Sequence, residues 1–191
     1  MKQIAVYCGA SKGNKPIYEE YAVRLGTWIA RHHYGLVYGG GKVGLMGCVA
    51  DAVLGLGGTA IGIMPQFLVD REIAHQGLSR LIITQDMDER KKKMMAQSDC
   101  CIALPGGPGT LEEISEAVSW ARVGENDSPC VFLNVNGYYD LIKSFLDQMV
   151  GEGFLTAEDR SKILITDDFD EIETYMDSYA PPHVRRYAEN S

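Results

Sequence analysis

The segment CCIALPGGPGTLEEISEA, residues 100–117, passes from an apolar run through three glycines and a threonine into an acidic segment. A short apolar run bounded by turn residues is typical of a buried strand, and the segment after the glycines is typical of a helix. The same plan of strand, small-residue loop and helix is repeated at 3–33 and at 35–58. Apolar strands that alternate with helices predict a parallel sheet covered by helices on both faces. We therefore expect one doubly wound α/β domain over residues 1–191.

The rest of the chain continues this alternation. We expect further strands at 59–65, 80–85, 129–135 and 162–167, further helices at 86–98, 110–124, 137–153 and 168–179, and an irregular segment at 66–79. In folds of this class, ligands bind beyond the carboxyl ends of the strands. Three loops rich in glycine and other small residues lie at such ends, at 8–13, 39–44 and 105–109. These loops are therefore expected to form the ligand site.

The composition excludes several functional classes. The net charge of −8 argues against a broad nucleic-acid surface, because phosphate neutralisation needs clustered cations. No apolar run approaches the roughly 20 residues that span a membrane, and the first residues do not resemble a signal peptide. The five cysteines form no CxxC pair and no metal-binding pattern with the four histidines, which is typical of free thiols in a reducing cytoplasm. We expect a cytoplasmic protein that binds no nucleic acid, membrane or metal.

The loop GGGKVG, residues 39–44, has the G-x-G-x-x-G spacing of a dinucleotide-binding loop. That fingerprint also requires an acidic residue about 20 positions further on, to hold a ribose hydroxyl. This chain has IMP there, residues 63–65, which argues against NAD as a cofactor. Glycine loops before a helix also bind simpler anions through backbone N–H groups. Gly40, Gly41 and Gly44 are therefore candidates for an additional phosphate or ribose loop, with a tight turn that binds nothing as the alternative.

The second glycine loop offers the backbone N–H groups of Gly106, Gly107 and Gly109 and the hydroxyl of Thr110 at the start of a helix. Such a loop is a good cradle for a phosphate. Glu113, three residues after the threonine, has two interpretations. In a T-x-x-E capping box its carboxylate only satisfies a backbone N–H at the helix start. In a nucleotide site the same carboxylate lies where the sugar would be, one turn from the phosphate.

The run ERKKKM, residues 89–94, holds four of the 18 lysines and arginines. A charge run is usually a solvated helix face. Met87, Arg90 and Met94, however, follow the i, i+3, i+7 spacing of one side of a helix, which places the arginine on an apolar stripe. An unpaired buried charge is costly, so Arg90 is expected to meet an anion. Glu113 or a substrate phosphate could supply it.

Together these motifs resemble the LOG (Lonely Guy) family, the cytokinin riboside 5′-monophosphate phosphoribohydrolases. PGGPGTLEE at 105–113 resembles the family's PGGxGTxxE signature, and RKKKM at 90–94 resembles its R-K-x-x-M element. GLVYGGGKVGLMG at 35–47 and VNGYYDLI at 135–142 are similar to two further segments. The resemblance covers about residues 3–155. It implies a Rossmann-like fold, a homodimer, no cofactor, and hydrolysis of a nucleoside 5′-monophosphate to free base and ribose 5-phosphate.

The resemblance also implies roles for individual residues. Arg90 and Glu113 match the family's catalytic pair. The residues implied to bind substrate are Glu72, Lys91, Gly106, Gly107, Gly109, Thr110 and Ser119. Relatives are often labelled lysine decarboxylases, but such an enzyme needs pyridoxal phosphate on a lysine, and nothing in the sequence singles out that lysine.

Two other functions remain open at the level of sequence. The same loops would serve a nucleotide carrier or sensor that performs no chemistry. The Arg90–Glu113 pair argues against it, because a pure binder needs no carboxylate beside the anomeric carbon. The other alternative, an NAD-dependent enzyme, lacks the acidic residue described above. The sequence does not indicate which base is preferred.

Overall fold

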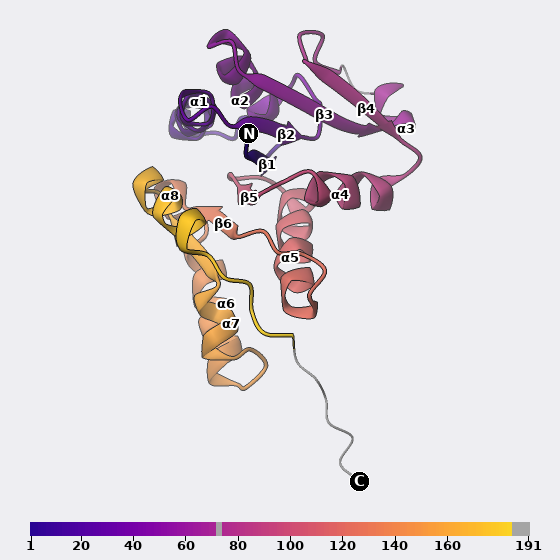
Figure 1. Cartoon of the computed structure of the whole chain (residues 1–191). Helices are drawn as coiled ribbons and strands as arrows, with labels where there is room; N and C mark the ends of the chain where they lie inside the picture. Colours follow the sequence, from indigo (N-terminus) through magenta and orange to yellow (C-terminus); the bar gives the residue numbers. More distant parts are fainter. Residues whose placement is uncertain (72–73, 185–191) are drawn as a thin grey trace.

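The computed structural model describes residues 1–71 and 74–184. Its centre is one sheet of seven strands in the order β4-β3-β2-β1-β5-β6-β7, in which every neighbouring pair is parallel (Figure 1). The strands are β1 Gln3–Tyr7, β2 Gly35–Tyr38, β3 Thr59–Pro65, β4 Arg80–Thr84, β5 Cys100–Ala103, β6 Cys130–Leu133 and β7 Ile163–Thr166. The predicted doubly wound, Rossmann-like α/β fold is thereby confirmed.

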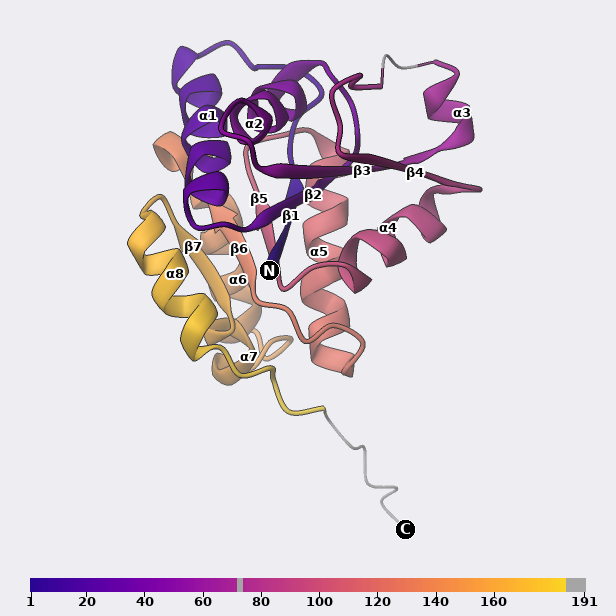
Figure 2. The same ribbon diagram turned by 45° about the horizontal axis from the view of Figure 1, so that its top comes forward.

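Helices pack on both faces of this sheet (Figure 2). Apolar side chains of α1, α2 and α8 join one core cluster, and those of α4, α5 and α6 join the cluster on the other face. The helices are α1 Pro16–Arg31, α2 Gly44–Gly55, α3 Gln66–Val69, α4 Met87–Ala96, α5 Pro108–Val123, α6 Asp140–Gly151, α7 Ala157–Ser161 and α8 Phe169–Ser178, with a short 3-10 turn at Val135–Gly137.

Local sequence signals explain where most of these elements begin and end. Pro16 opens α1 at a position where its missing N–H costs nothing. The carboxylate of Asp86 accepts the N–H of Glu89 and so caps α4. Gly124 ends α5 in the left-handed conformation, with φ of 82°. These positions agree with the helices expected from the sequence to within two residues.

The structure differs from the sequence-based expectation at three helices. Residues 66–69 form the short helix α3 inside the segment expected to be irregular, and α7 was not expected. Helices of four or five residues are too short to show an apolar period, which is why the pattern misses them. Helix α5 begins at Pro108, two residues before the expected start at 110, because Gly107 takes the N-cap position.

The order of the strands places a crevice beside β1. The chain first runs outward from β1 through β2 and β3 to β4, and then returns to form β5 on the other side of β1. The loops that follow β1 and β5 therefore diverge to opposite faces, which is the arrangement that binds ligands in open α/β sheets. The N–H of Gly9 donates to the carbonyl of Pro105 at 3.1 Å, and the N–H of Leu45 donates to the carbonyl of Gly9 at 3.0 Å. The three predicted loops thus meet at one place.

All five cysteines are free, and four of them are buried. Burial raises the pKa of Cys8 and of Cys100, so these thiols stay neutral and pack as small apolar side chains. Over residues 1–71 and 74–184, the helices are all too short or too polar to cross a lipid bilayer.

Candidate active site

A cavity of about 260 Å³ lies where the three loops meet. The loops after β1, β2 and β5 form part of its wall, and helices α2, α3, α4 and α5 contribute the rest. It is lined by Cys8, Gly9, Ala10, Gly39, Met46, Leu68, Met87, Arg90, Gly107, Gly109, Thr110, Glu112 and Glu113. Five residues predicted from the sequence are therefore brought together here, namely Arg90, Gly107, Gly109, Thr110 and Glu113.

An ion pair between α4 and α5 forms the charged wall of this cavity. Nη2 of Arg90 lies 3.1 Å from Oε1 of Glu113, and the two side chains are only 12% and 9% exposed. Nη1 of the same guanidinium contacts the sulfur of Met87 at 3.5 Å. The prediction that Arg90 lies on an apolar stripe and meets an anion is thereby confirmed. Its buried Nε has no hydrogen-bond partner within the described residues.

The environment of Glu113 changes its acidity. Burial raises the pKa of the Glu113 carboxyl above the 4.5 of an ordinary glutamate, and the positive charge of Arg90 opposes this rise. The two effects act on the same group in opposite directions. The carboxylate is therefore only partly stabilised by its partner, which suits a group that must interact with a transient positive charge or take up a proton.

The start of α5 excludes the capping-box interpretation of Glu113. Gly107 is the N-cap and has no side chain that could cap the helix, while Thr110 is already the third helical residue. A capping box needs the threonine at the N-cap, so Thr110 and Glu113 do not form one. The hydroxyl of the buried Thr110 makes no hydrogen bond to any described residue. The first N–H groups of α5 and this hydroxyl therefore remain available to an anion.

Lys91 lies next to the cavity but does not line it. Its ammonium contacts Glu112 and Glu116 of α5, the second at 2.9 Å. The hydrogen bond to Glu112 is the main cause that raises the pKa of Lys91. Lys91 thus links α4 to α5 immediately behind the Arg90–Glu113 pair. Its predicted contact with substrate stays a prediction.

Ser119 lies on a different surface. It lines an apolar groove of about 310 Å³ between α5 and α6, together with Phe132, Phe145 and Leu146. Within one chain, this groove and the charged cavity have separate linings. Glu72, the remaining residue expected to bind substrate, lies outside the described residues.

In the first glycine loop, residues 39–44, the residue that lines the cavity is Gly39 and not one of the three predicted glycines. Gly40 and Gly44 have positive φ angles of 83° and 64°, and Gly44 packs against the backbone of Ala10. Gly41 forms an isolated bridge with Ala74. Contact of Gly40, Gly41 and Gly44 with a phosphate or ribose stays a prediction. The neighbouring Gly39 does line the cavity.

The glycine loop after β5 lies between two cavities. Gly107 lines the charged cavity, whereas Gly106 lines only the adjoining one, of about 220 Å³, with Lys12, Tyr18 and Tyr138. The two cavities share Gly9 and Gly107. Binding of a phosphate by Gly106 therefore stays a prediction.

Sequence reasoning missed several residues of the cavity wall. Gly39, Met46 and Leu68 come from three different elements, and none belongs to a motif that suggested a contact with Arg90. A Cβ atom on Gly39 would lie 2.5 Å from Nη2 of Arg90, so this glycine leaves room for the guanidinium. Only the position of Met87 on the stripe of Arg90 offered a usable signal.

A family model described as "possible lysine decarboxylase" matches residues 46–176. The cytokinin riboside 5′-monophosphate phosphoribohydrolase LOG1 of Arabidopsis thaliana is 42% identical over 182 residues, which are 95% of this chain and 85% of that protein. A probable enzyme of the same name, LOGL2 of Oryza sativa subsp. japonica, is also 42% identical, over 95% of this chain and 75% of its own length.

Solved structures share the fold at lower sequence identity. The Moco carrier protein from Chlamydomonas reinhardtii has a TM-score of 0.70 at 20% identity, over 93% of this chain and 99% of that chain. The molybdenum cofactor binding protein from Rippkaea orientalis has a TM-score of 0.67 at 21% identity, over 93% and 96%. These likenesses concern the fold alone. The family model covers more than half of the chain and LOG1 aligns with nearly all of it, so the chain belongs to the LOG family of cytokinin riboside 5′-monophosphate phosphoribohydrolases.

Proposed function

We propose that this protein hydrolyses the N-glycosidic bond of a purine or cytokinin riboside 5′-monophosphate, releasing the free base and ribose 5-phosphate. The observation that carries the proposal is the buried Arg90–Glu113 pair, 3.1 Å apart, in the same cavity as the uncapped start of α5. The first two turns of α5 thus bring to one cavity the donors for a phosphate and a carboxylate for the reacting carbon. The names of the two plant phosphoribohydrolases that align with this chain support the same reaction.

The start of α5 is the proposed phosphate site. The N–H groups of Gly107, Gly109 and Thr110 and the positive end of a 16-residue helix favour a dianion. The hydroxyl of Thr110 adds a donor that has no other partner among the described residues. A phosphate held here fixes the ribose, so that its anomeric carbon lies at a constant distance from the carboxylate one turn along the helix.

Glu113 is the proposed catalytic carboxylate. When the C1′–N bond breaks, its electrons leave with the base and positive charge develops on the ribose, as in other glycoside hydrolyses. The ionised carboxylate stabilises that charge, and it accepts a proton from the water whose oxygen forms the new bond to C1′. The departing base nitrogen takes up one proton from solvent, and Glu113 returns its own proton to solvent, so that one water is consumed in each turnover. Arg90 favours the ionised form of Glu113 and lines the same cavity.

The description of the family model as a lysine decarboxylase implies pyridoxal phosphate, which is held through a lysine. The residues do not fit that cofactor, because the described lining of the charged cavity contains no lysine. The nearby Lys91 is engaged by two glutamates. We therefore derive no step through pyridoxal phosphate.

On acidification, the activity is expected to fall when Glu113 is protonated. This loss should occur at a higher pH than it would for a glutamate with an ordinary pKa. Protonation removes the charge that Glu113 needs, so kcat rises with pH through the pKa of this group. Because burial raises that pKa, the midpoint of the acidic limb should lie above pH 4.5. A profile of kcat from pH 4 to 9 at constant ionic strength measures it. A midpoint at or below that of a solvated glutamate would contradict the role of Glu113.

Replacing Gly39 with alanine is expected to displace Arg90 without removing it. The new Cβ would lie 2.5 Å from Nη2, so the guanidinium has to turn away from Glu113. We expect kcat/KM to fall about tenfold. A tenfold fall corresponds to the loss of about 1.4 kcal/mol from the contact between Arg90 and Glu113. Gly55→Ala is the matched control, because a Cβ there meets nothing within 4 Å. Equal kinetics for the two variants would show that the position of Arg90 is unimportant.

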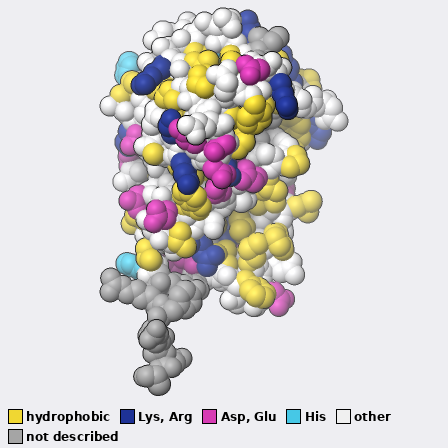
Figure 3. Space-filling model, turned by 90° about the vertical axis from the view of Figure 1, so that its right-hand side faces the viewer, with side chains coloured by type: hydrophobic (Ala, Val, Ile, Leu, Met, Phe, Trp, Pro, Cys, Tyr) yellow, Lys and Arg dark blue, Asp and Glu magenta, His cyan; other side chains and the backbone are white. Residues whose placement is uncertain are grey.

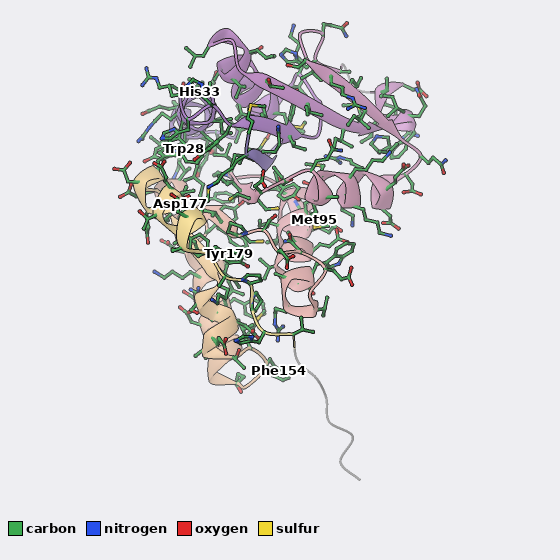
Figure 4. All side chains as sticks on the ribbon, viewed as in Figure 1. Trp28, His33, Met95, Phe154, Asp177 and Tyr179 are labelled. Atoms are coloured by element: carbon green, nitrogen blue, oxygen red, sulfur yellow. The ribbon has the colours of Figure 1, made fainter. Side chains whose placement is uncertain are left out.

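We further propose that the protein is a cytoplasmic homodimer whose contact lies over the apolar groove between α5 and α6. Near this groove the side chains of Leu141 and Phe154 are 83% and 78% exposed, and Phe145 is more than half exposed. Figure 3 shows hydrophobic side chains gathered over the lower part of one face, and Figure 4 shows Phe154 beyond the lower end of α6. Sedimentation of the wild type and of Phe145→Asp tests the contact, with a monomer expected only for the variant.

An end-point assay tests the proposed reaction. The protein is incubated with AMP, with isopentenyladenosine 5′-monophosphate and with the two matching nucleosides, and the released base is measured by chromatography. Base from the monophosphates alone would support the proposal, and the faster monophosphate identifies the preferred base. Nucleotide that binds without any release of base would support a carrier or sensor instead.

A further inference from the structure

Two consecutive tyrosines bind backbone carbonyls of the glycine loop after β5. The hydroxyl of Tyr138 donates to the carbonyl of Gly106 at 2.6 Å, and the hydroxyl of Tyr139 donates to the carbonyl of Leu104 at 2.7 Å. Both tyrosines come from the turn between β6 and α6, which follows the loop by about 30 residues. Neither residue lines the charged cavity, and Tyr138 lines only the adjoining one.

The turn that carries these tyrosines is held in one conformation by its own contacts. Asn136 and Gly137 both have positive φ angles, of 52° and 72°. The side chain of Asn134 donates to Asp140 at 2.8 Å and accepts the N–H of Tyr139 at 2.7 Å. A turn closed by two such hydrogen bonds keeps the two hydroxyls at fixed positions under the glycine loop.

The aromatic rings add packing to these hydrogen bonds. The rings of Tyr138 and Tyr139 meet edge to face with centroids 5.0 Å apart. Tyr139 packs in the same manner on Phe132 of β6, at 5.1 Å, and Tyr138 packs on Tyr18 of α1, at 5.8 Å. The two rings are therefore held between the sheet and α1, and their hydroxyls have little freedom to leave the loop.

Four successive carbonyl groups of the loop, from Leu104 to Gly107, each accept a hydrogen bond. The carbonyls of Leu104 and Gly106 accept the tyrosine hydroxyls, that of Pro105 accepts the N–H of Gly9, and that of Gly107 accepts the N–H of Leu111. In a trans peptide the C=O and N–H groups point in opposite directions. Because the carbonyl of Gly106 is directed at Tyr138, the N–H of Gly107 points away from that ring.

We infer that Tyr138 is a positioning residue, which fixes the glycine loop with the N–H of Gly107 directed at the phosphate of the substrate, while Tyr139 holds the start of the loop at Leu104. The inference rests on the proposed function, since it concerns the grip on the phosphate that the reaction needs. An anion site made of backbone N–H groups works only if the peptide planes are held before the ligand arrives. The loop contains three glycines within four residues, so its own sequence supplies little of that rigidity.

Tyr138→Phe is the sharper variant. The ring of Tyr138 is 43% exposed, so water can solvate the carbonyl of Gly106 once the hydroxyl is gone, and the protein should still fold. Tyr139 is buried, and its phenylalanine variant would leave the carbonyl of Leu104 without a donor. Tyr175→Phe is the matched control, because its hydroxyl also donates to a backbone carbonyl, that of Lys162, at 2.7 Å and far along the sheet from the site.

The test measures binding of the two reaction products by calorimetry, and kcat and KM for AMP. For Tyr138→Phe we expect ribose 5-phosphate to bind about tenfold more weakly and KM to rise by a similar factor, the size of one hydrogen bond. The affinity for adenine and kcat should change less than about threefold, because the base does not contact this loop. Tyr175→Phe should match the wild type in every one of these values.

The outcomes separate the inference from the function on which it rests. Identical binding of ribose 5-phosphate by Tyr138→Phe and Tyr175→Phe, in a protein that hydrolyses AMP, would overturn the inference alone. Equal losses for adenine and ribose 5-phosphate would also overturn it, because they would indicate general damage to the site. A wild-type protein that bound no ribose 5-phosphate would overturn the inference together with the proposed function.

Discussion

Glu113→Gln is expected to lower kcat about 10³-fold, the middle of the range for a positioned acid–base group, while the protein still folds and binds nucleotide. Glutamine has nearly the same volume as glutamate, and its amide oxygen can still accept a hydrogen bond from Arg90. What the variant loses is the negative charge beside the anomeric carbon and the ability to take up a proton. Steady-state release of adenine from AMP measures the loss, and circular dichroism verifies the fold.

Glu116→Gln serves as the control for this experiment. Glu116 lies one turn further along α5 and does not line the charged cavity, and its partner Lys91 keeps a second contact with Glu112. We expect this variant to retain most of its activity. If Glu113→Gln also retained substantial activity, the carboxylate of Glu113 would have no part in the reaction, and the carrier or sensor function would be favoured.

Arg90→Ala is expected to lower kcat/KM by about 10²- to 10³-fold, because it removes both a donor to the ligand and the charge that favours ionised Glu113. With Arg90 absent, burial and the charges of Glu112 and Glu116 still raise the pKa of the Glu113 carboxyl and only Lys91 opposes them, so this pKa should rise further. The acidic limb of the pH profile should accordingly move to higher pH than in the wild type. The readouts are kcat/KM for AMP and the midpoint of that limb.

Lys93→Ala is the control on the same helix. Lys93 forms an exposed pair with Glu89 at 2.7 Å, and such a surface pair contributes only about 0.3–0.5 kcal/mol to stability. Its removal should leave the kinetics unchanged. A variant Arg90→Ala with the wild-type pH midpoint would show that the guanidinium does not act on Glu113, even if the activity were lower.

Much of the site could be predicted from short patterns in the sequence. The spacing of Met87, Arg90 and Met94 placed the arginine on the apolar side of its helix, and the structure shows it there, paired with Glu113. The glycines around 107 marked the start of a helix in a parallel α/β fold. Both signals are local, because a helical period and a glycine turn depend on neighbours only a few residues apart.

Other parts of the site depend on elements that are distant in the sequence. The T-x-x-E pattern at Thr110 suggested a capping box, but Gly107 takes the N-cap and the pattern falls inside the helix. Gly39 faces Arg90 only because the guanidinium of Arg90 reaches from α4 to the loop after β2. No pattern in residues 134–140 indicated that Tyr138 would reach the carbonyl of Gly106.

By itself, the sequence determined the alternation of strands and helices, the positions of the glycine loops and the apolar side of the helix that carries Arg90. These features follow from backbone preferences and from burial along one element. Only the tertiary structure decided which side chains meet. The return of the chain from β4 to β5 beside β1 brings the loops after β1, β2 and β5 to one crevice. The contact of Arg90 with Glu113 depends on this packing. The two residues lie on different helices, and patterns within a few neighbouring residues do not determine how two helices pack together.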